Sequence, residues 1–221
     1  EKRAAAGLTR QNWKSAVLIV LAFVGIYIVR TVVSVAVQGV SDGSGMQYVK
    51  EWAAMFKNPM MWLNIAALPI NYFFVFIAFF GEEYGWRYYL QPVLQKRFGL
   101  RAGVIILGVV WGLWHIPDDL FYYTQTSGIQ MIFAQQITCI SLGIFFAYAY
   151  MKTQNIWVPV CLHYLNNNLI PIISGTFSAD VLENQTVSWK DLPVALVLNG
   201  LCFGFFLLAD VFKKKEVQEE E

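Results

Sequence analysis

The sequence predicts an all-α protein that crosses the membrane several times, folded as a polytopic bundle of about six transmembrane helices. Hydrophobic residues make up 57% of the 221 residues and charged residues only 14%, whereas soluble domains have about 45–50% and about 25%. The apolar residues also gather in runs of roughly 20, which is the length that crosses the hydrocarbon core of a bilayer. No polar block is long enough to bury a core of its own, so we expect one membrane-embedded domain over residues 1–221.

Six apolar runs are the expected spans. In chain order they cover residues 13–40, 60–80, 102–121, 129–151, 156–173 and 192–212. Apart from Lys14 at its start, the first run contains a single charge, Arg30. We expect this side chain either to pair with a carboxylate or to extend to the membrane interface.

The segment between the second and third spans, residues 81–100, is of a different kind. It mixes basic residues such as Lys96 and Arg97 with aromatic and aliphatic ones. That mixture is typical of an amphipathic helix lying at the membrane interface. Pro92 lacks a backbone N–H, so we expect it to break or kink this helix.

The distribution of basic residues predicts the orientation, because cytoplasmic loops carry an excess of Lys and Arg. With six spans, four basic regions fall on one side: the N-terminal flank, the 81–101 connection, Lys152 and residues 213–215. On the other side, the loop 122–128 has no charge and the loop 175–191 has three acidic residues against one lysine. We therefore expect both termini in the cytoplasm.

Net charge and cysteine usage exclude several other classes. The net charge of +1 gives no electrostatic basis for a nucleic-acid partner. The three cysteines, Cys139, Cys161 and Cys202, lie in apolar runs and are odd in number. We interpret them as small buried hydrophobic residues rather than as a disulfide framework or a metal-binding pair.

Charged residues cluster at the end of the second span, in the order Glu82-Glu83-x-x-x-Arg87. On a helix, Glu83 and Arg87 are four positions apart and share a face, so they can form an ion pair. Glu82 then points about 100° away. A carboxylate without an ion-pair partner suits a general base, although an interfacial charge cluster at a helix end would have the same pattern.

The two histidines of the chain both lie inside apolar spans. They form the patterns Trp111-x-x-x-His115 in the third span and His163-x-x-x-Asn167 in the fifth. His163 and Asn167 are four positions apart and share a helix face. A single histidine is usually a satisfied core residue, but ionisable groups within membrane spans are costly and are candidates for function.

Four more polar residues flank these motifs. Asn166 and Asn168 are expected to point to other faces and to bond neighbouring helices. Asp118 and Asp119 follow Pro117 closely after His115. Two interpretations of the aspartates stay open: they line a cavity and orient His115, or they mark the outer end of the third span.

Taken in order, the three motifs resemble the CAAX protease and bacteriocin-processing family, also called the Abi family, which includes the CAAX prenyl endopeptidases. The resemblance covers about residues 81–168, with Trp111 standing where phenylalanine is commoner. It implies a hydrolase, an intramembrane protease. Glu83, Arg87 and Trp111 would then support and order the motifs.

The resemblance also implies catalytic roles. Glu82 would activate the attacking water, and His115 would help to hold that water. His163 and Asn167 would stabilise the tetrahedral oxyanion, which requires His163 to present an N–H. Loss of one such donor costs about 10²–10³-fold in rate.

A divalent metal such as zinc is the competing mechanism, with Glu82, His115 and His163 as its ligands. The chain has no His-Glu-x-x-His motif, whose two histidines bind zinc from one helix, and asparagine is a poor zinc ligand. We therefore favour the metal-free mechanism with Glu82 and expect no cofactor.

The expected function is hydrolysis of a peptide bond in a membrane-associated substrate within the lipid bilayer. That substrate is a peptide or a lipidated protein, either a prenylated C-terminal tail or a bacteriocin- or pheromone-like peptide. The sequence does not specify an oligomeric state. The alternatives are a non-catalytic membrane protein that binds a partner as an immunity or regulatory factor, and a transporter. Against a transporter, the two halves of the chain lack matching broken helices.

Overall fold

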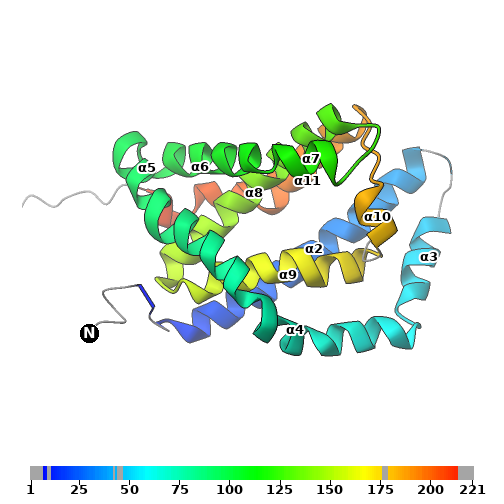
Figure 1. Cartoon of the computed structure of the whole chain (residues 1–221), viewed down its shortest axis with the longest axis horizontal. Coiled ribbons are helices and arrows are strands. Elements are labelled where there is room, and N and C mark those ends of the chain that lie inside the picture. The colour runs from blue at the N-terminus through cyan, green and yellow to red at the C-terminus, as the bar shows by residue number, and fades with distance from the viewer. Residues whose placement is uncertain (1–6, 9–10, 42, 44–46, 176–178, 214–221) are drawn as a thin grey trace, which may run out of the picture.

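The computed structural model is helical throughout the part of the chain it describes, residues 7–8, 11–41, 43, 47–175 and 179–213 (Figure 1). The predicted all-α class is confirmed. The α-helices are α2 (Trp13–Ser41), α3 (Gln47–Met55), α4 (Pro59–Glu83), α5 (Gln91–Phe98), α6 (Leu100–Trp114), α7 (Ile116–Phe121), α8 (Gly128–Thr153), α9 (Trp157–Ser174), α10 (Ala179–Glu183) and α11 (Asp191–Cys202). A π-helix, η1 (Tyr84–Leu90), and two 3₁₀ helices, η2 (Gly204–Leu208) and η3 (Asp210–Phe212), complete the described elements.

Within the described residues, four helical stretches are long and apolar enough to cross a membrane: Trp13–Val37, Pro59–Phe98, Leu100–Phe121 and Gly128–Thr153. They correspond to the first four expected spans and indicate an integral membrane protein. The count of six is not confirmed, because α9 is not among these stretches and α11 has only 12 residues. Of the basic residues used for orientation, Lys2, Arg3, Arg10, Lys214 and Lys215 lie outside the described residues.

The prediction of a single helix over residues 192–212, the expected sixth span, was wrong. α11 ends at Cys202, and two short 3₁₀ helices follow it. Glycine at position 204 is a poor helix former, and Ala209 between the 3₁₀ helices is extended, with φ −63° and ψ 152°. The connection between the first two expected spans also contains a helix, α3.

The segment 81–100 is not a separate helix. α4, η1 and α5 form one continuous helical path that ends at Phe98 (Figure 1). At 1.5 Å per residue, its 40 residues extend to about 60 Å, twice the roughly 30 Å of a bilayer core. One end of this path must therefore leave the hydrocarbon region. The basic residues Lys96 and Arg97 lie in the last turn of α5. They indicate that the α5 end is the one outside the hydrocarbon region.

Pro92 does not break the helix, which was one of the two effects expected of it. Instead a π-helix precedes it. Proline cannot donate to the carbonyl four residues earlier, and its ring crowds that carbonyl. The turn before Pro92 is widened: the N–H of Gln91 bonds to the carbonyl of Trp86, five residues back. Wide turns of this kind are common at functional sites, and this one carries Arg87.

α8 is the central helix and packs most closely on α6. A Cβ atom added to Gly108 of α6 would lie 2.6 Å from the Cα of Ile140 on α8. A Cβ atom added to Gly112, one turn later, would lie 2.6 Å from the side chain of Gln136 on α8. Small residues four positions apart let two membrane helices approach closely. This approach places α6, and with it Trp111, against the core.

α2 packs on α8 through aromatic rings. Phe23 is fully buried, with its ring centroid 5.6 Å from that of Phe145 and 5.8 Å from that of Phe203. Further along α2, Arg30 pairs with no carboxylate in the described chain; its Nε donates to the Oδ1 of Asn199 on α11 at 3.1 Å. An amide oxygen is thus the hydrogen-bond partner of Arg30.

Replacing Gly108 with alanine is expected to lower the free energy of unfolding by about 1–3 kcal/mol. The added methyl group meets the α8 backbone rather than a flexible side chain, and overpacking of a close contact costs that much. Alanine's higher helix propensity offsets at most about 1 kcal/mol. Thermal unfolding in detergent measures the effect.

Gly25→Ala is the matched control, because a Cβ at this α2 position has no heavy atom within 4 Å. It should leave the unfolding temperature unchanged or raise it slightly. Equal stability of the two variants would show that α6 and α8 do not approach as closely as described.

Candidate functional site

A buried carboxylate joins the end of α4 to α9. Glu83 is fully buried, and its Oε2 accepts from the Nε of Arg87 at 2.8 Å. Its Oε1 lies 3.0 Å from the Nδ1 of His163. Arg87, also fully buried, reaches the carbonyl of Gly143 on α8 through Nη1 at 3.5 Å. The expected ion pair between Glu83 and Arg87 is present, and it links three helices.

The contact with Glu83 determines which nitrogen of His163 is available. An ionised carboxylate only accepts hydrogen bonds, so His163 donates to Glu83 through Nδ1–H. Nε2 is then the ring nitrogen left for a ligand. In the neutral imidazole this Nε2 carries a lone pair, and it carries a proton only in the imidazolium.

His115 lies at a helix break. α6 ends at Trp114 and α7 begins at Ile116, because Pro117 cannot continue the hydrogen-bond ladder of α6. The Nδ1 of His115 is 2.8 Å from the carbonyl oxygen of Trp111 and 3.8 Å from the Sγ of Cys139. A carbonyl only accepts, so Nδ1 carries the proton, and the Nε2 of neutral His115 is an acceptor.

Trp111 lies between the two histidines. Its ring centroid is 5.8 Å from that of His115 and 5.4 Å from that of His163. The Arg87 guanidinium stands over the same indole at 5.3 Å. One aromatic side chain therefore sets the spacing of both imidazoles, which come together although they belong to different spans.

A cavity of about 370 Å³ brings most of the predicted site together. Trp111, His115, His163 and Asn167 all line it. Glu83 and Arg87 are buried behind it. The other lining residues are Tyr122, Tyr123, Gln135, Thr138, Cys139, Leu142, Asn166, Pro171, Leu182 and Gln185.

Glu82 is not among the residues that line the cavity. It is partly buried, and its Oε2 is 3.5 Å from the Nε1 of Trp86. It lies within electrostatic range of Cys139, the thiol next to His115. Unlike Glu83, Glu82 is engaged in no ion pair within the described chain. The two adjacent glutamates thus have the different environments that their spacing predicts.

The sequence analysis missed several polar residues of this cavity. Gln135 and Thr138 come from α8, and Gln185 comes from the segment after α10. Gln135 and Thr138 are three positions apart inside an apolar run. This helical spacing of two polar residues could have indicated that both face the same cavity. Gln185 has no such signal, because only the fold brings it to the cavity.

The asparagines after His163 have distinct partners. Asn166 accepts from the hydroxyl of Tyr27 on α2 and donates to the Oδ1 of Asn167. Asn168 instead donates to the carbonyl of Tyr164 on its own helix at 3.0 Å. The expected bond to a neighbouring helix is therefore confirmed for Asn166 and wrong for Asn168.

Asp119 is fully buried, and neither of its carboxylate oxygens has a hydrogen-bond partner among the described residues. Its backbone N–H donates to the carbonyl of His115 at 2.9 Å. Neither Asp118 nor Asp119 lines the cavity. Both lie in α7, near the end of the apolar stretch Leu100–Phe121. The structure thus favours the second interpretation of these residues, the outer end of a span.

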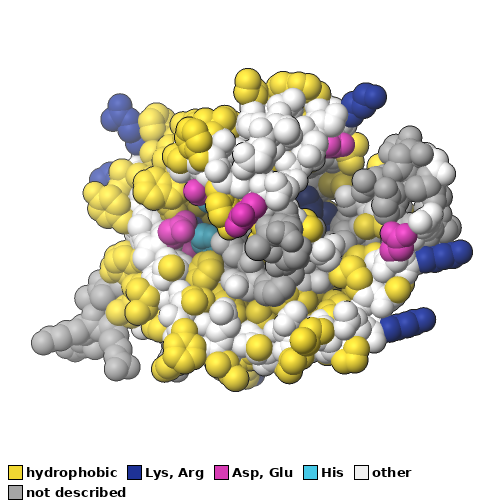
Figure 2. Space-filling view, turned by 45° about the vertical axis from the view of Figure 1, so that its right-hand side comes forward, with side chains coloured by type: hydrophobic (Ala, Val, Ile, Leu, Met, Phe, Trp, Pro, Cys, Tyr) yellow, Lys and Arg dark blue, Asp and Glu magenta, His cyan; other side chains and the backbone are white. Residues whose placement is uncertain are grey.

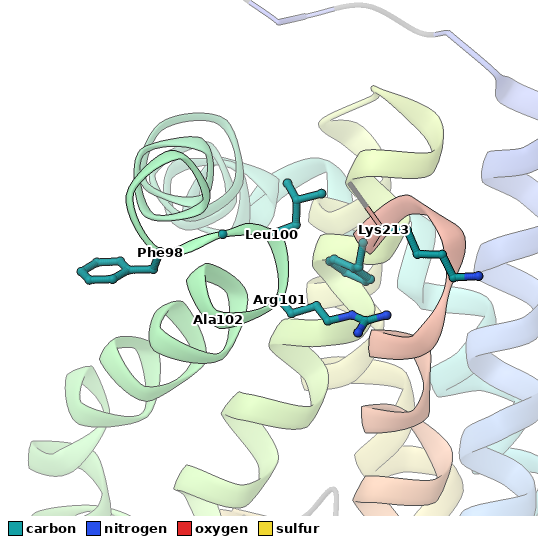
Figure 3. A pocket seen from close by; sticks show the side chains of 7 residues that line it. Phe98, Leu100, Arg101, Ala102 and Lys213 are labelled. Atoms are coloured by element: carbon teal, nitrogen blue, oxygen red, sulfur yellow. The ribbon is translucent and has the colours of Figure 1, made fainter. Parts of the chain in front are cut away.

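Acidic side chains gather around a histidine on the face shown in Figure 2, which is otherwise rich in hydrophobic side chains. A second hollow, of about 480 Å³, is lined by the turn between α5 and α6 and by the end of η3 (Figure 3). It contains Arg101 and Lys213 but neither histidine. Of these two cavities, the first therefore has the residues for acid–base chemistry.

The described residues do not fit a metal centre with three protein ligands. No three His, Cys, Asp or Glu side chains in this part of the chain converge closely enough to hold an ion. Of the three expected ligands, His115 and His163 each keep Nε2 for a ligand.

Two comparisons relate this arrangement to known proteins. Residues 62–169 match the family model of the type II CAAX prenyl endopeptidases, Rce1-like. A CAAX prenyl protease 2 from Methanococcus maripaludis is 27% identical over 125 residues, which cover 52% of this chain. The matched part spans 45% of the relative's own length. No solved structure matches the chain.

Residues 62–169, the CAAX protease segment, are therefore similar to this family. The resemblance inferred from the three motifs is confirmed. The CAAX protease segment contains all seven predicted site residues, from Glu82 to Asn167, together with α6 and α8. α2 and α11 lie outside it, although α2 contacts Asn166 within the cavity wall.

In this CAAX protease segment, Glu83→Gln is expected to lower the free energy of unfolding by about 3–5 kcal/mol. It leaves the buried Arg87 without its counter-charge, and breaking one partner of a buried ion pair has that cost. Thermal or denaturant unfolding of the purified protein in detergent measures the loss.

Glu82→Gln provides the control at the neighbouring position. Because Glu82 is only partly buried and forms no ion pair in the described chain, its stability change should stay within about 0.5 kcal/mol. Similar losses for both glutamines would contradict the assignment of Glu83 as the structural carboxylate.

Proposed function

We propose that this chain is an intramembrane endopeptidase that hydrolyses a peptide bond of a membrane-associated substrate. The observation that carries the proposal is the pair of histidines on one cavity. Each has its Nδ1 engaged and its Nε2 left for a ligand. The similarity of residues 62–169 to the CAAX protease family supports the same reaction.

The nucleophile of this reaction is a water molecule. Glu82, the carboxylate outside the ion pair, takes a proton from the water, while the Nε2 of His115 accepts a hydrogen bond from it. The water oxygen then bonds to the carbonyl carbon, and the carbonyl electrons move to the oxygen. A positioned base of this kind contributes about 10²–10⁴-fold.

The resulting oxyanion is stabilised by His163 and Asn167. His163 donates through Nε2 as the imidazolium, which Glu83 stabilises through Nδ1. This arrangement resembles the carboxylate–histidine pairing of serine proteases. When the tetrahedral intermediate collapses, the C–N bond breaks and the proton held by Glu82 passes to the leaving amine. Glu83 and Arg87 thus hold the donor rather than react.

The substrate we propose is the prenylated C-terminal tail of a protein, with a bacteriocin- or pheromone-like peptide as the second candidate. The name of the archaeal relative, CAAX prenyl protease 2, favours the first. Exposed apolar side chains along α4, including Ile70, Phe73, Phe74 and Ile77, favour an enzyme that meets lipid-linked substrates within the bilayer.

Purified protein in lipid should cleave a prenylated peptide, and Glu82→Gln should reduce kcat by at least about 10²-fold through loss of the general base. A strong chelator should leave cleavage unchanged. The cleavage products, measured by mass spectrometry, give the rate and the position of the broken bond.

Other outcomes of this assay would contradict parts of the proposal. Persistent cleavage by folded Glu82→Gln would overturn the role of Glu82. Cleavage that a chelator stops and an added divalent ion restores would favour the metal mechanism. A partner-binding or immunity protein would keep its activity in Glu82→Gln, because glutamine is nearly isosteric with glutamate.

We also propose six spans with both termini in the cytoplasm. In a variant without native cysteines, Thr126→Cys should react with a membrane-impermeant maleimide in intact cells. Lys152→Cys should react only after permeabilisation. The expectation follows from the excess of basic residues on the side of Lys152. The reverse labelling pattern would show that the chain has the opposite orientation in the membrane.

A further inference from the structure

A chain of hydrogen bonds runs from α2 to the cavity. The hydroxyl of Tyr27 donates to the Oδ1 of Asn166. The Nδ2 of Asn166 in turn donates to the Oδ1 of Asn167 at 2.8 Å. The chain therefore passes from a buried tyrosine, through one amide, to the asparagine that lines the cavity.

This chain determines which half of the Asn167 amide faces a ligand. An asparagine side chain offers either an acceptor oxygen or a donor NH₂ group, and the two ends have nearly the same shape. Here the oxygen of Asn167 is occupied by Asn166. The NH₂ group is thus left for the cavity, and this is the half that an oxyanion requires.

Tyr27 is held firmly enough to act as an anchor. Only 4% of its surface is exposed, and its ring contacts Phe23 and Phe203 at centroid distances of 4.9 and 5.0 Å. The guanidinium of Arg30 stands 5.7 Å from the same ring and is itself bonded to Asn199. Side chains of α2, together with Phe203 directly after α11, therefore fix the position of the hydroxyl.

We propose that Tyr27 is a positioning residue for the oxyanion site. Acting through Asn166, its hydroxyl keeps the NH₂ group of Asn167 turned toward the substrate carbonyl. The inference rests on the proposed protease function, and it gives α2, which lies outside the family segment 62–169, a part in the reaction. α2 is then more than a membrane anchor.

The first test measures kinetics. Tyr27→Phe removes only the hydroxyl, so it should lower kcat about tenfold, the size of one net hydrogen bond, with KM changed less than about twofold. Asn166→Asp keeps the acceptor for Tyr27 but removes the donor to Asn167, so it should lower kcat further. A change in KM alone, or no change in kcat, would overturn the proposal.

Tyr164→Phe is the matched control. The Tyr164 hydroxyl is another tyrosine hydroxyl that bonds across helices, to the carbonyl of Leu68 on α4 at 2.7 Å, but it has no bond to Asn166 or Asn167. Its loss should leave kcat unchanged even where it lowers the unfolding temperature. An equal fall of kcat in both variants would show a general effect of lost packing and overturn the specific role of Tyr27.

A second measurement does not depend on catalysis. In protein labelled with [¹⁵N]asparagine, the side-chain NH₂ signals of Asn167 can be assigned by their absence in Asn167→Asp. Tyr27→Phe should shift or broaden these signals, and Tyr164→Phe should not. Unchanged signals in Tyr27→Phe would overturn the proposal. If the wild type cleaves no peptide, the protease function fails, and these spectra alone decide whether Tyr27 orients Asn167.

Discussion

The Glu83 carboxylate is the interaction on which the rest of the site depends. It lies in a fully buried position, between the Arg87 guanidinium and the Nδ1 of His163. An isolated charge in such a place would be very costly, and it is tolerated because it is paired and hydrogen-bonded on both oxygens. The same bonds connect α4 and η1 to α9, and they decide that His163 meets the cavity through Nε2. The stability of the fold and the chemistry of one histidine thus have a common origin.

Irregular backbone places the other parts of the site. Pro92 is preceded by a π-helix that carries Arg87, and Pro117 separates α6 from α7 at His115. In both cases proline removes a helical hydrogen bond, and a side chain of the candidate site lies next to the disturbance. Close packing of α6 on α8 through Gly108 then brings Trp111 between the two imidazoles. The spacing of the histidines is therefore set by backbone approach and by one indole ring.

The cavity is completed by parts of the chain beyond the family segment. Leu182 and Gln185, after residue 169, line it, and Tyr27, before residue 62, bonds to its wall. The motifs contain the candidate site residues, but the orientation of the Asn166 and Asn167 amides also depends on Tyr27 of α2, which lies outside the matched segment.

The sequence by itself determined the all-α class, the first four apolar stretches, the Glu83–Arg87 pair and the shared helix face of His163 and Asn167. These features are local, since runs of apolar residues and spacings of four positions act within a single helix. Only the tertiary structure decided that Glu83 binds His163, that Tyr27 reaches Asn166, and that the last expected span divides into α11 and two 3₁₀ helices. The first two contacts join residues 80 and 139 positions apart. Partners at such separations are chosen by how the helices pack, which no spacing within one helix can specify.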